Sequence, residues 1–352
     1  MRLDREFWRG KRVLLTGHTG FKGAWLARWL ARLGADVVGV SLPPPSDPSL
    51  HALLHTRLSG EHILDIGDAD ATRRVVDEAR ADIVLHLAAQ SLVPESYDDP
   101  VGTFRTNVMG SVHLLDALRS SAARSNTKAI VVVTTDKVYA NDESGRAFVE
   151  SDRLGGDDPY SASKSAAEIA VHAWKHSFMS DGPPLATARA GNVIGGGDWA
   201  SHRLIPDIVR AARSGQPLDI RRPDASRPWQ HVLDPLHGYL LYAQALATGE
   251  KVPESLNFAL ADTKSLTVRE IADSLTQAFG VKSWRHVPAP GTKEKNALSL
   301  DASLARNTLG WKPKFSGSEA IASTVAWYKA WAGGEDAEAL TDRQIDMFEK
   351  MP

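Results

Sequence analysis

The sequence predicts an α/β protein in which a doubly wound parallel sheet is followed by a smaller, mostly C-terminal α/β domain. In the first half, short apolar runs alternate with amphipathic helical stretches, as they do in βαβ units. After about residue 190 this alternation gives way to glycine-rich and polar loops between helices. The chain has 352 residues, which is enough for a sheet domain and a substantial second unit.

Apolar runs predict the strands of the sheet. These runs are RVLLTG (12–17), DVVGVSL (36–42), HILDI (62–66), DIVLHLAA (82–89), AIVVVTT (129–135) and LATARAGNVIG (185–195). Helices are predicted between them at 21–34, 70–80, 100–120 and 160–178. In the first helix, Trp25, Leu26 and Trp29 share one face, and Gly34 ends the helix.

The same pattern suggests a domain division. We assign residues 1–189, together with roughly 229–261, to the sheet domain, and residues 190–228 and 262–352 to the second domain. The proline-rich segment 41–49 is too short to be a domain linker, and we expect it to be a rigid loop.

Composition excludes several classes of protein. The 41 Lys and Arg residues balance 43 Asp and Glu residues, a formal charge of −2 that argues against a nucleic-acid-binding protein. The absence of cysteine excludes disulfides, thiolate zinc sites and cysteine nucleophiles, and we predict no metal site. No apolar run approaches the roughly 18 residues of a membrane span, and segment 1–12 is charged, unlike a signal peptide. We expect a cytoplasmic protein with no membrane partner.

A glycine motif lies between the first strand and the first helix. Gly17, Gly20 and Gly23 stand in TGHTGFKG, where glycine lets the backbone turn tightly and approach a pyrophosphate at the helix N-terminus. In this context the motif predicts a Rossmann-type dinucleotide-binding domain. The second strand ends in VSLPPP without an acidic residue, so it does not decide between NAD and NADP. Asp65, beside Ile66, suits either the adenine amino group or a turn.

A tyrosine and a lysine form a second motif in PYSASK. Tyr160 and Lys164 are four residues apart at the start of a helix, so both point the same way. A phenol has a pKa of about 10, and a neighbouring ammonium lowers it, which makes the tyrosine a usable base. Thr135 ends the preceding strand, and Asp136 and Lys137 follow it as either a solvated strand end or an acid and a base at a cleft.

Together these motifs resemble the extended short-chain dehydrogenase/reductase superfamily, which is marked by TGxxGxxG, a strand ending in Ser or Thr, and YxxxK. TTDKVY resembles the strand end of the nucleotide-sugar 4,6-dehydratases, most of which carry Thr-Asp-Glu. Lys137 stands in the Glu position, as in the CDP-glucose 4,6-dehydratases. HTGFKG and GNVIGGGDWA also agree, and the resemblance covers about residues 8–330.

The resemblance implies a mechanism for a nucleotide sugar and NAD. Tyr160, assisted by Lys164, would take the proton of the sugar 4-hydroxyl during oxidation at C4, and Thr135 would hydrogen-bond that hydroxyl. Lys137, if neutral, would then take the C5 proton while Asp136 protonates the departing C6 hydroxyl, before hydride returns to C6. The implied cofactor-binding residues are Gly17, Gly20, Phe21, Gly23, Asp65, Ile66, Ala88, Tyr160 and Lys164.

The implied substrate residues come from the second half of the chain. They are Asn192, Arg203, Leu204 and Arg227. The guanidinium fork suits a phosphate, although each arginine could instead form an ordinary surface ion pair. Two stretches depart from the family: AAQSLVPESY lacks an expected arginine, and GTKEKNAL carries Glu294 without the expected His or Tyr. Relatives usually dimerise through two long helices, so a homodimer is expected.

Two other functions remain open. A nucleotide-sugar 4-epimerase or reductase on this scaffold would need Tyr160, Lys164 and the cofactor, but not the pair at 136 and 137. A non-catalytic dinucleotide-binding protein would show a degraded catalytic set, whereas Thr135, Asp136, Tyr160 and Lys164 are all present.

Overall fold

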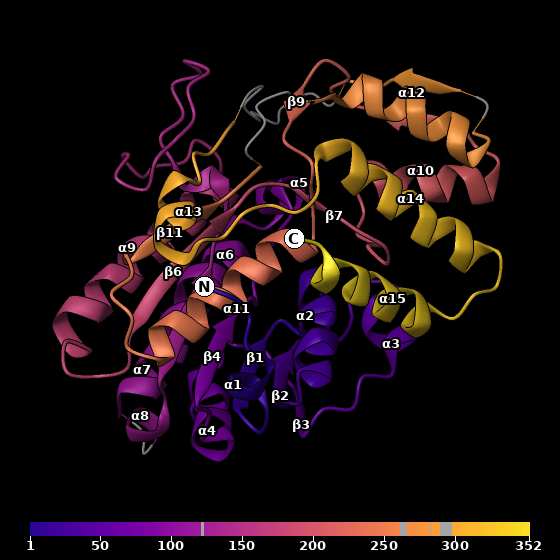
Figure 1. Cartoon of the computed structure of the whole chain (residues 1–352). Coiled ribbons are helices and arrows are strands. Elements are labelled where there is room, and N and C mark those ends of the chain that lie inside the picture. The colour runs from indigo at the N-terminus through magenta and orange to yellow at the C-terminus, as the bar shows by residue number, and fades with distance from the viewer. Residues whose placement is uncertain (121–122, 261–265, 282, 289–297) are drawn as a thin grey trace.

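The computed structural model describes residues 1–120, 123–260, 266–281, 283–288 and 298–352. Seven parallel strands form its central sheet (Figure 1). In spatial order they are β11 (Ser255–Phe258), β6 (Leu185–Ala190), β5 (Ala129–Val133), β4 (Ile83–His86), β1 (Arg12–Thr16), β2 (Asp36–Ser41) and β3 (Gly60–Ile63). The order reverses between β1 and β4, which is the switch point of a doubly wound sheet. The predicted Rossmann-type fold class is confirmed.

Helices and short strand pairs make up the rest of the regular structure. The helices that cover the sheet or carry its crossovers are α1 (Arg5–Trp8), α2 (Phe21–Arg32), α3 (Leu50–Leu54), α4 (Ala69–Ala79), α5 (Val93–Asp98), α6 (Pro100–Phe104), the π-helix η1 (Arg105–Met109), α7 (Gly110–Ser120), α8 (Ala123–Asn126), the 3-10 helix η2 (Asp136–Val138), α9 (Pro159–Phe178) and α11 (Leu233–Ala247). The remaining helices are α10 (Leu204–Ser214), α12 (Val268–Phe279), α13 (Ser303–Leu309), α14 (Gly317–Ala332) and α15 (Ala337–Lys350). The short strands are β7 (Val193–Ile194), β8 (Leu218–Ile220), β9 (Ser226–Arg227), β10 (Gln230–His231), β12 (Leu266–Thr267) and β13 (Trp284–His286).

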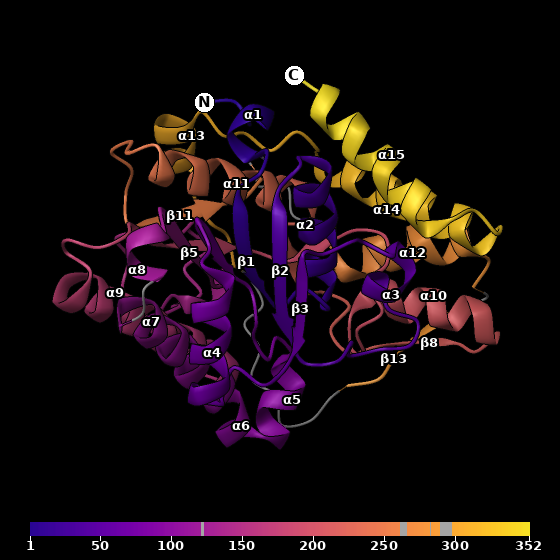
Figure 2. The same cartoon turned by 90° about the horizontal axis from the view of Figure 1, so that it is seen from below.

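Alternate residues of the inner strands belong to two separate apolar cores, because successive side chains point to opposite faces of a sheet. Val13 and Leu15 of β1 belong to the core that contains Trp25 of α2 and the buried residues of α11. Leu14 belongs to the other core, with residues of α4, α7 and α9 such as Val76. Figure 2 shows these two helix layers on either side of the sheet.

Two predicted strands end differently in the structure. The run 62–66 leaves the sheet after Ile63, because the Asp65 carboxylate accepts a hydrogen bond from Gly67 N (2.8 Å) and turns the chain. The run 185–195 is divided into β6 and β7. The chain leaves the central sheet after Ala190, at Gly191. The following strand β7 pairs with β10 and not with a strand of the central sheet.

The second half of the chain packs smaller units beside the sheet. Helix α10 packs against α12, and the two-stranded pairs β8–β13 and β9–β12 lie among these helices. Helix α11 contacts β5, β4 and β11 of the central sheet. The boundaries of the two-domain division stay a prediction. Glu294, in the loop 289–297, lies outside the described residues. Within the described part of the chain, no helix is both long and apolar enough to cross a bilayer.

Candidate active site

A cleft of about 1110 Å³ opens at the carboxyl ends of the central strands. This is the edge where doubly wound sheets bind ligands. Most of the predicted site residues line it: Gly17, Gly20, Phe21, Gly23, Asp65, Ile66, Ala88, Thr135, Lys137, Tyr160, Lys164, Asn192, Arg203 and Leu204. The structure therefore brings residues from the first strand, the fifth strand and the second half of the chain around one space. Their individual roles stay predictions.

The backbone of the glycine turn leaves no room for a side chain at two of its positions. Gly17 has a φ of +77°, and a Cβ there would lie 2.7 Å from Ala88 N. A Cβ on Gly23 would lie 2.0 Å from Gly17 O, so α2 could not start so close to the turn. Gly20 precedes α2 without a side-chain cap, which leaves the first N–H groups of the helix beside the cleft. This cradle fits a pyrophosphate.

The adenosine side of the cleft has no acid at the end of β2. There Thr19 Oγ1 is 2.7 Å from Ser41 Oγ and donates to Leu42 O at 2.9 Å. Asp65 lines the cleft, but its carboxylate also makes the turn at Gly67 and accepts from Arg105 Nη2 at 3.0 Å. The Asp65 carboxylate therefore forms a turn, and its contact with an adenine amino group stays a prediction.

Helix α9 presents the tyrosine and the lysine to the cleft. Asp158 caps the helix by accepting from Ser161 N at 2.9 Å, which fixes the first turn. Tyr160 and Lys164 then follow on one face, and both are buried. Lys164 Nζ donates to Val133 O at 3.0 Å, which ties the helix to the last residue of β5.

Burial changes the proton affinities of both residues. It raises the pKa of Tyr160 above its ordinary value, against the opposing effects of Lys137, a hydrogen bond with Thr135, and Arg203. Burial lowers the pKa of Lys164 to about 8. The expected lowering of the tyrosine pKa is therefore wrong, because desolvation of the phenolate outweighs the effect of the nearby cations. Lys137, rather than Lys164, is the strongest of those cations.

Thr135, Asp136 and Lys137 form one short turn after β5. Thr135 is the N-cap of η2, and its hydroxyl donates to Asp136 Oδ1 at 2.9 Å. Lys137 Nζ lies 3.9 Å from the same oxygen. Asp136 is only 3% exposed, so it is a buried carboxylate rather than a solvated strand end. It lies just behind the cleft wall, where a Cβ on Gly191 would be 3.1 Å from its Oδ2.

The predicted substrate residues lie toward the second half of the chain. Arg203 is the N-cap residue of α10, and it donates to Asp198 Oδ2 at 2.9 Å and to Ser91 Oγ at 3.3 Å. It thus forms an ion pair and also lines the cleft. Asn192 lines the cleft where the chain leaves β6. Arg227 belongs to β9, and its side chain lies outside what the structure describes.

Lys22 is a cleft residue that the sequence interpretation missed. It lies in the first turn of α2, lines the cleft, and its Nζ is 5.9 Å from the centre of the Tyr239 ring. Burial, with Arg203 next in effect, lowers its pKa to about 8, while Asp136 opposes the shift. HTGFKG contains this lysine, but only the fold shows that it is half-buried at the cleft, beside Tyr239 of α11.

The two lysines predict a pH dependence of substrate capture. Below pH 8 Lys22 and Lys164 are both cationic, so the cleft attracts anionic ligands; above pH 8 both lysines lose their charge. Because kcat/KM reports the free enzyme, it should fall as pH rises through about 8. Lys22→Gln should lower kcat/KM at pH 7 and make the fall shallower. A flat wild-type profile from pH 7 to 9 would contradict this.

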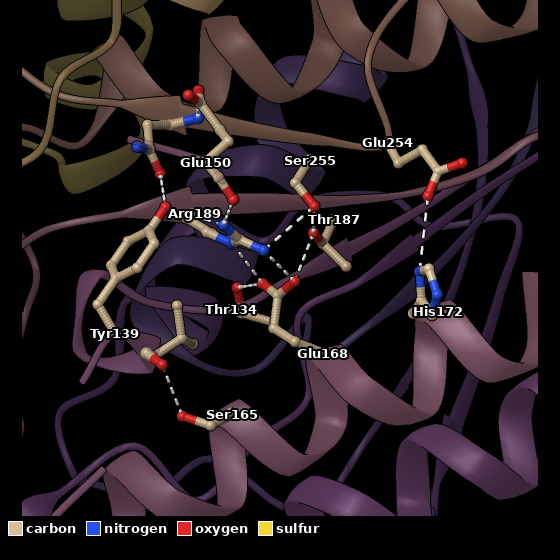
Figure 3. A network of polar contacts seen from close by, with 12 residues as sticks. Thr134, Tyr139, Glu150, Ser165, Glu168, His172, Thr187, Arg189, Glu254 and Ser255 are labelled. Carbon is tan, nitrogen blue, oxygen red and sulfur yellow. Dashed lines mark hydrogen bonds and ion pairs between the residues drawn. The ribbon is translucent and has the colours of Figure 1, made fainter. Parts of the chain in front are cut away.

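A buried polar network lies beside the end of β5 (Figure 3). Glu168 and Arg189 form a buried ion pair in which both guanidinium Nε (2.9 Å) and Nη2 (2.8 Å) donate to the carboxylate. The Thr134 hydroxyl also donates to Glu168, and the Thr187 hydroxyl does so at 2.8 Å. Arg189 Nη1 donates to the Tyr139 hydroxyl at 2.8 Å. The network thus joins α9, β6 and the residues on either side of η2.

Fold and site together define a class. A doubly wound sheet with a glycine cradle, a Tyr-Lys pair on α9 and an acidic and a basic residue after β5 is typical of a nucleotide-sugar dehydratase of the extended short-chain dehydrogenase/reductase superfamily. Comparison with known families makes this specific. The profile of the family described as GDP-mannose 4,6 dehydratase matches residues 14–324, and the chain belongs to this family.

Individual relatives agree with the family assignment. The CDP-glucose 4,6-dehydratase of Salmonella typhimurium is 44% identical, over 98% of this chain and 98% of that protein. UDP-glucuronate 4-epimerase 1 of Arabidopsis thaliana is 30% identical, over 92% of this chain and 78% of that protein. The crystal structure of a dTDP-glucose 4,6-dehydratase from Streptomyces venezuelae, with NAD bound, has a TM-score of 0.79 and 27% identity, covering 94% of this chain and 99% of that one. The predicted family is confirmed.

Proposed function

We propose that this protein is an NAD-dependent CDP-glucose 4,6-dehydratase, a hydro-lyase that forms CDP-4-keto-6-deoxy-D-glucose. The observation that carries the proposal is that Lys137, Tyr160 and Lys164 line one cleft, with Asp136 directly behind its wall and 3.9 Å from Lys137 Nζ. An epimerase or reductase needs the second pair only. The 44% identical CDP-glucose 4,6-dehydratase supports the choice of nucleotide, and the glycine cradle supports a dinucleotide cofactor.

Oxidation at C4 depends on Tyr160. NAD+, when bound by the glycine cradle and α9, would supply the hydride acceptor for C4 and the hydride donor for C6. Tyr160 takes the proton of the 4-hydroxyl, and the cationic charges of Lys137 and Arg203 stabilise its phenolate against the cost of burial. Lys164 donates a hydrogen bond to Val133 O, and this bond holds the part of α9 that carries Tyr160 against the end of β5.

Elimination depends on the state of one proton shared by Asp136 and Lys137. The base must be a neutral amine, and the acid must be a protonated carboxyl. Transfer of one proton from the Lys137 ammonium to the Asp136 carboxylate, whose atoms are 3.9 Å apart, converts the ion pair into this neutral pair. Lys137 then takes the C5 proton, and Asp136 gives its proton to the C6 hydroxyl, which leaves as water.

Thr135 closes the proton cycle. After one turnover Lys137 returns its proton to C5, Tyr160 retains the proton from the 4-hydroxyl, and Asp136 lacks one. The Thr135 hydroxyl donates to Asp136 at 2.9 Å and is hydrogen-bonded with Tyr160, so it connects donor and acceptor. A proton that passes along this hydroxyl restores the starting state.

A panel of sugar nucleotides tests the proposal. The protein is incubated with NAD+ and CDP-, UDP-, dTDP- or GDP-glucose, and products are followed by mass spectrometry as the loss of one water. We expect rapid dehydration of CDP-glucose. Reaction only with another nucleotide would overturn the substrate, and accumulation of a 4-epimer without water loss would overturn the dehydratase.

We also propose a cytoplasmic homodimer. The composition without cysteine and the resemblance to dimeric relatives support it. Light scattering coupled to gel filtration tests the dimer, and a monomeric mass across micromolar concentrations would contradict it.

A further inference from the structure

Two histidines converge on one carboxylate oxygen beneath the glycine turn. His18 Nε2 lies 2.8 Å from Glu61 Oε1, and His51 Nε2 lies 3.1 Å from the same oxygen. The two imidazole rings meet edge to face, with centroids 5.1 Å apart. All three ligand atoms lie within 4.8 Å of one another. No function described above uses this cluster.

We infer that His18, His51 and Glu61 form a binding site for a divalent transition metal such as Zn²⁺. Two imidazoles and one carboxylate are a donor set that zinc binds, with a solvent molecule completing a tetrahedron. Zinc–ligand bonds of about 2.0–2.2 Å separate neighbouring ligand atoms by about 3.3 Å. The Nε2–Oε1 distances of 2.8 and 3.1 Å need only a small opening to reach this value.

The surrounding chain holds the ligands in place. His18 is fully buried, and Gly39 of β2 makes room for its ring, since a Cβ there would lie 2.7 Å from the imidazole. Within the described residues His18 Nδ1 has no hydrogen-bond partner, so Nε2 is the nitrogen engaged with Glu61. The other two ligands are accessible, with side-chain exposures of 21% for His51 and 42% for Glu61, so an ion can enter from solvent.

A second histidine pair in the chain provides a matched contrast. His172 and His176, one turn apart on α9, lie near Glu254. There Lys175 Nζ is 3.1 Å from Glu254 Oε1, so an ammonium already neutralises the carboxylate. Among the described residues, the ion pairs of Glu61 are those with His18 and His51. Within that part of the chain a metal cation would therefore not compete with a lysine ammonium paired to Glu61.

A bound ion would join three segments that flank the cofactor cradle. His18 belongs to the glycine turn, Glu61 to β3, and His51 to α3, whose first residue Leu50 lines the cleft together with Ser49. The metal would act as a cross-link between these segments. Because the ion would bind the folded chain and not the unfolded chain, it would raise the thermal unfolding midpoint.

Cobalt provides the direct test. Tag-free protein is stripped with a chelator, dialysed and titrated with Co²⁺, and visible absorption reports four-coordinate binding. We expect saturation at one ion per chain, and a higher unfolding midpoint with Zn²⁺. His51→Asn and Glu61→Gln should each lose both effects, whereas the double variant His172→Asn/His176→Asn should keep them.

Several results would overturn the site. Wild-type protein without stoichiometric Co²⁺ binding would do so. Binding that survives both His51→Asn and Glu61→Gln, or that is lost with His172→Asn/His176→Asn, would also do so. Circular dichroism of each variant, with unfolding midpoints measured in chelator, establishes that the two single variants fold.

Discussion

Replacing Lys137 by alanine is expected to stop the reaction after oxidation at C4. General-base catalysis typically contributes about 10²–10⁴-fold, so turnover should fall by a factor in that range. Tyr160 and Lys164 remain in place on α9 and Arg203 still stabilises the phenolate, so the sugar can still be oxidised, although more slowly. Reduced nicotinamide should then accumulate, and its near-ultraviolet absorbance in a single turnover measures it.

The Lys137 prediction has a matched control at the other end of the same strand. Lys128 directly precedes β5, and its Nζ donates only to Ser125 O at 3.4 Å among the contacts described. Lys128→Ala should leave turnover unchanged. Wild-type turnover of Lys137→Ala would remove this residue from the mechanism. Loss of turnover without reduced nicotinamide would instead assign Lys137 to the oxidation step, through its effect on Tyr160.

Replacing Glu168 by alanine is expected to cause the largest loss of stability among the changes considered. It leaves the Arg189 guanidinium buried without its carboxylate, and breaking a buried ion pair by removing one partner costs about 3–5 kcal/mol. The hydroxyls of Thr134 and Thr187 also lose their acceptor. Urea unfolding followed by circular dichroism measures the free energy of unfolding.

A surface carboxylate in the same view is the control. Glu254 pairs with Lys175 at 3.1 Å, and the carboxylate side chain is 46% exposed (Figure 3 shows Glu254 beside α9). Glu254→Ala should cost only about 0–1 kcal/mol, as exposed pairs do. Glu168→Gln keeps an acceptor and should cost less than Glu168→Ala. Equal costs for Glu168→Ala and Glu254→Ala would show that the buried network adds no net stability.

Local patterns explain why much of the fold was predictable. Strand β5 is an unbroken run of apolar residues, and the glycine turn has a spacing that its backbone requires: a side chain at Gly17 or Gly23 would collide with neighbouring backbone. Tyr160 and Lys164 are adjacent on a helix simply because they are four residues apart. In each case the determining neighbours are close in sequence.

The rest of the site depends on neighbours that are distant in sequence. Glu168 reads as an ordinary helical carboxylate, and only the fold brings Arg189 of β6 to it, 21 residues away. From the sequence Lys22 looks like a helix surface residue, and only the fold places it in the cleft near Tyr239 of α11. The direction of the Tyr160 pKa was predicted wrongly because a sequence shows the neighbouring ammonium but not the depth of burial.

The spacing of residues on α9 has a further consequence. Tyr160, Lys164 and Glu168 are four residues apart, so one helical stripe carries the proposed base, the neighbouring lysine and the buried ion-pair partner of Arg189. The proposed elimination pair, Asp136 and Lys137, belongs to a separate three-residue turn, η2. Chemistry at C5 and C6 can therefore diverge through substitutions at two adjacent positions. The residues proposed for oxidation at C4 lie on a helix that the buried ion pair holds in place. We therefore expect the oxidation step to tolerate fewer substitutions than the elimination step.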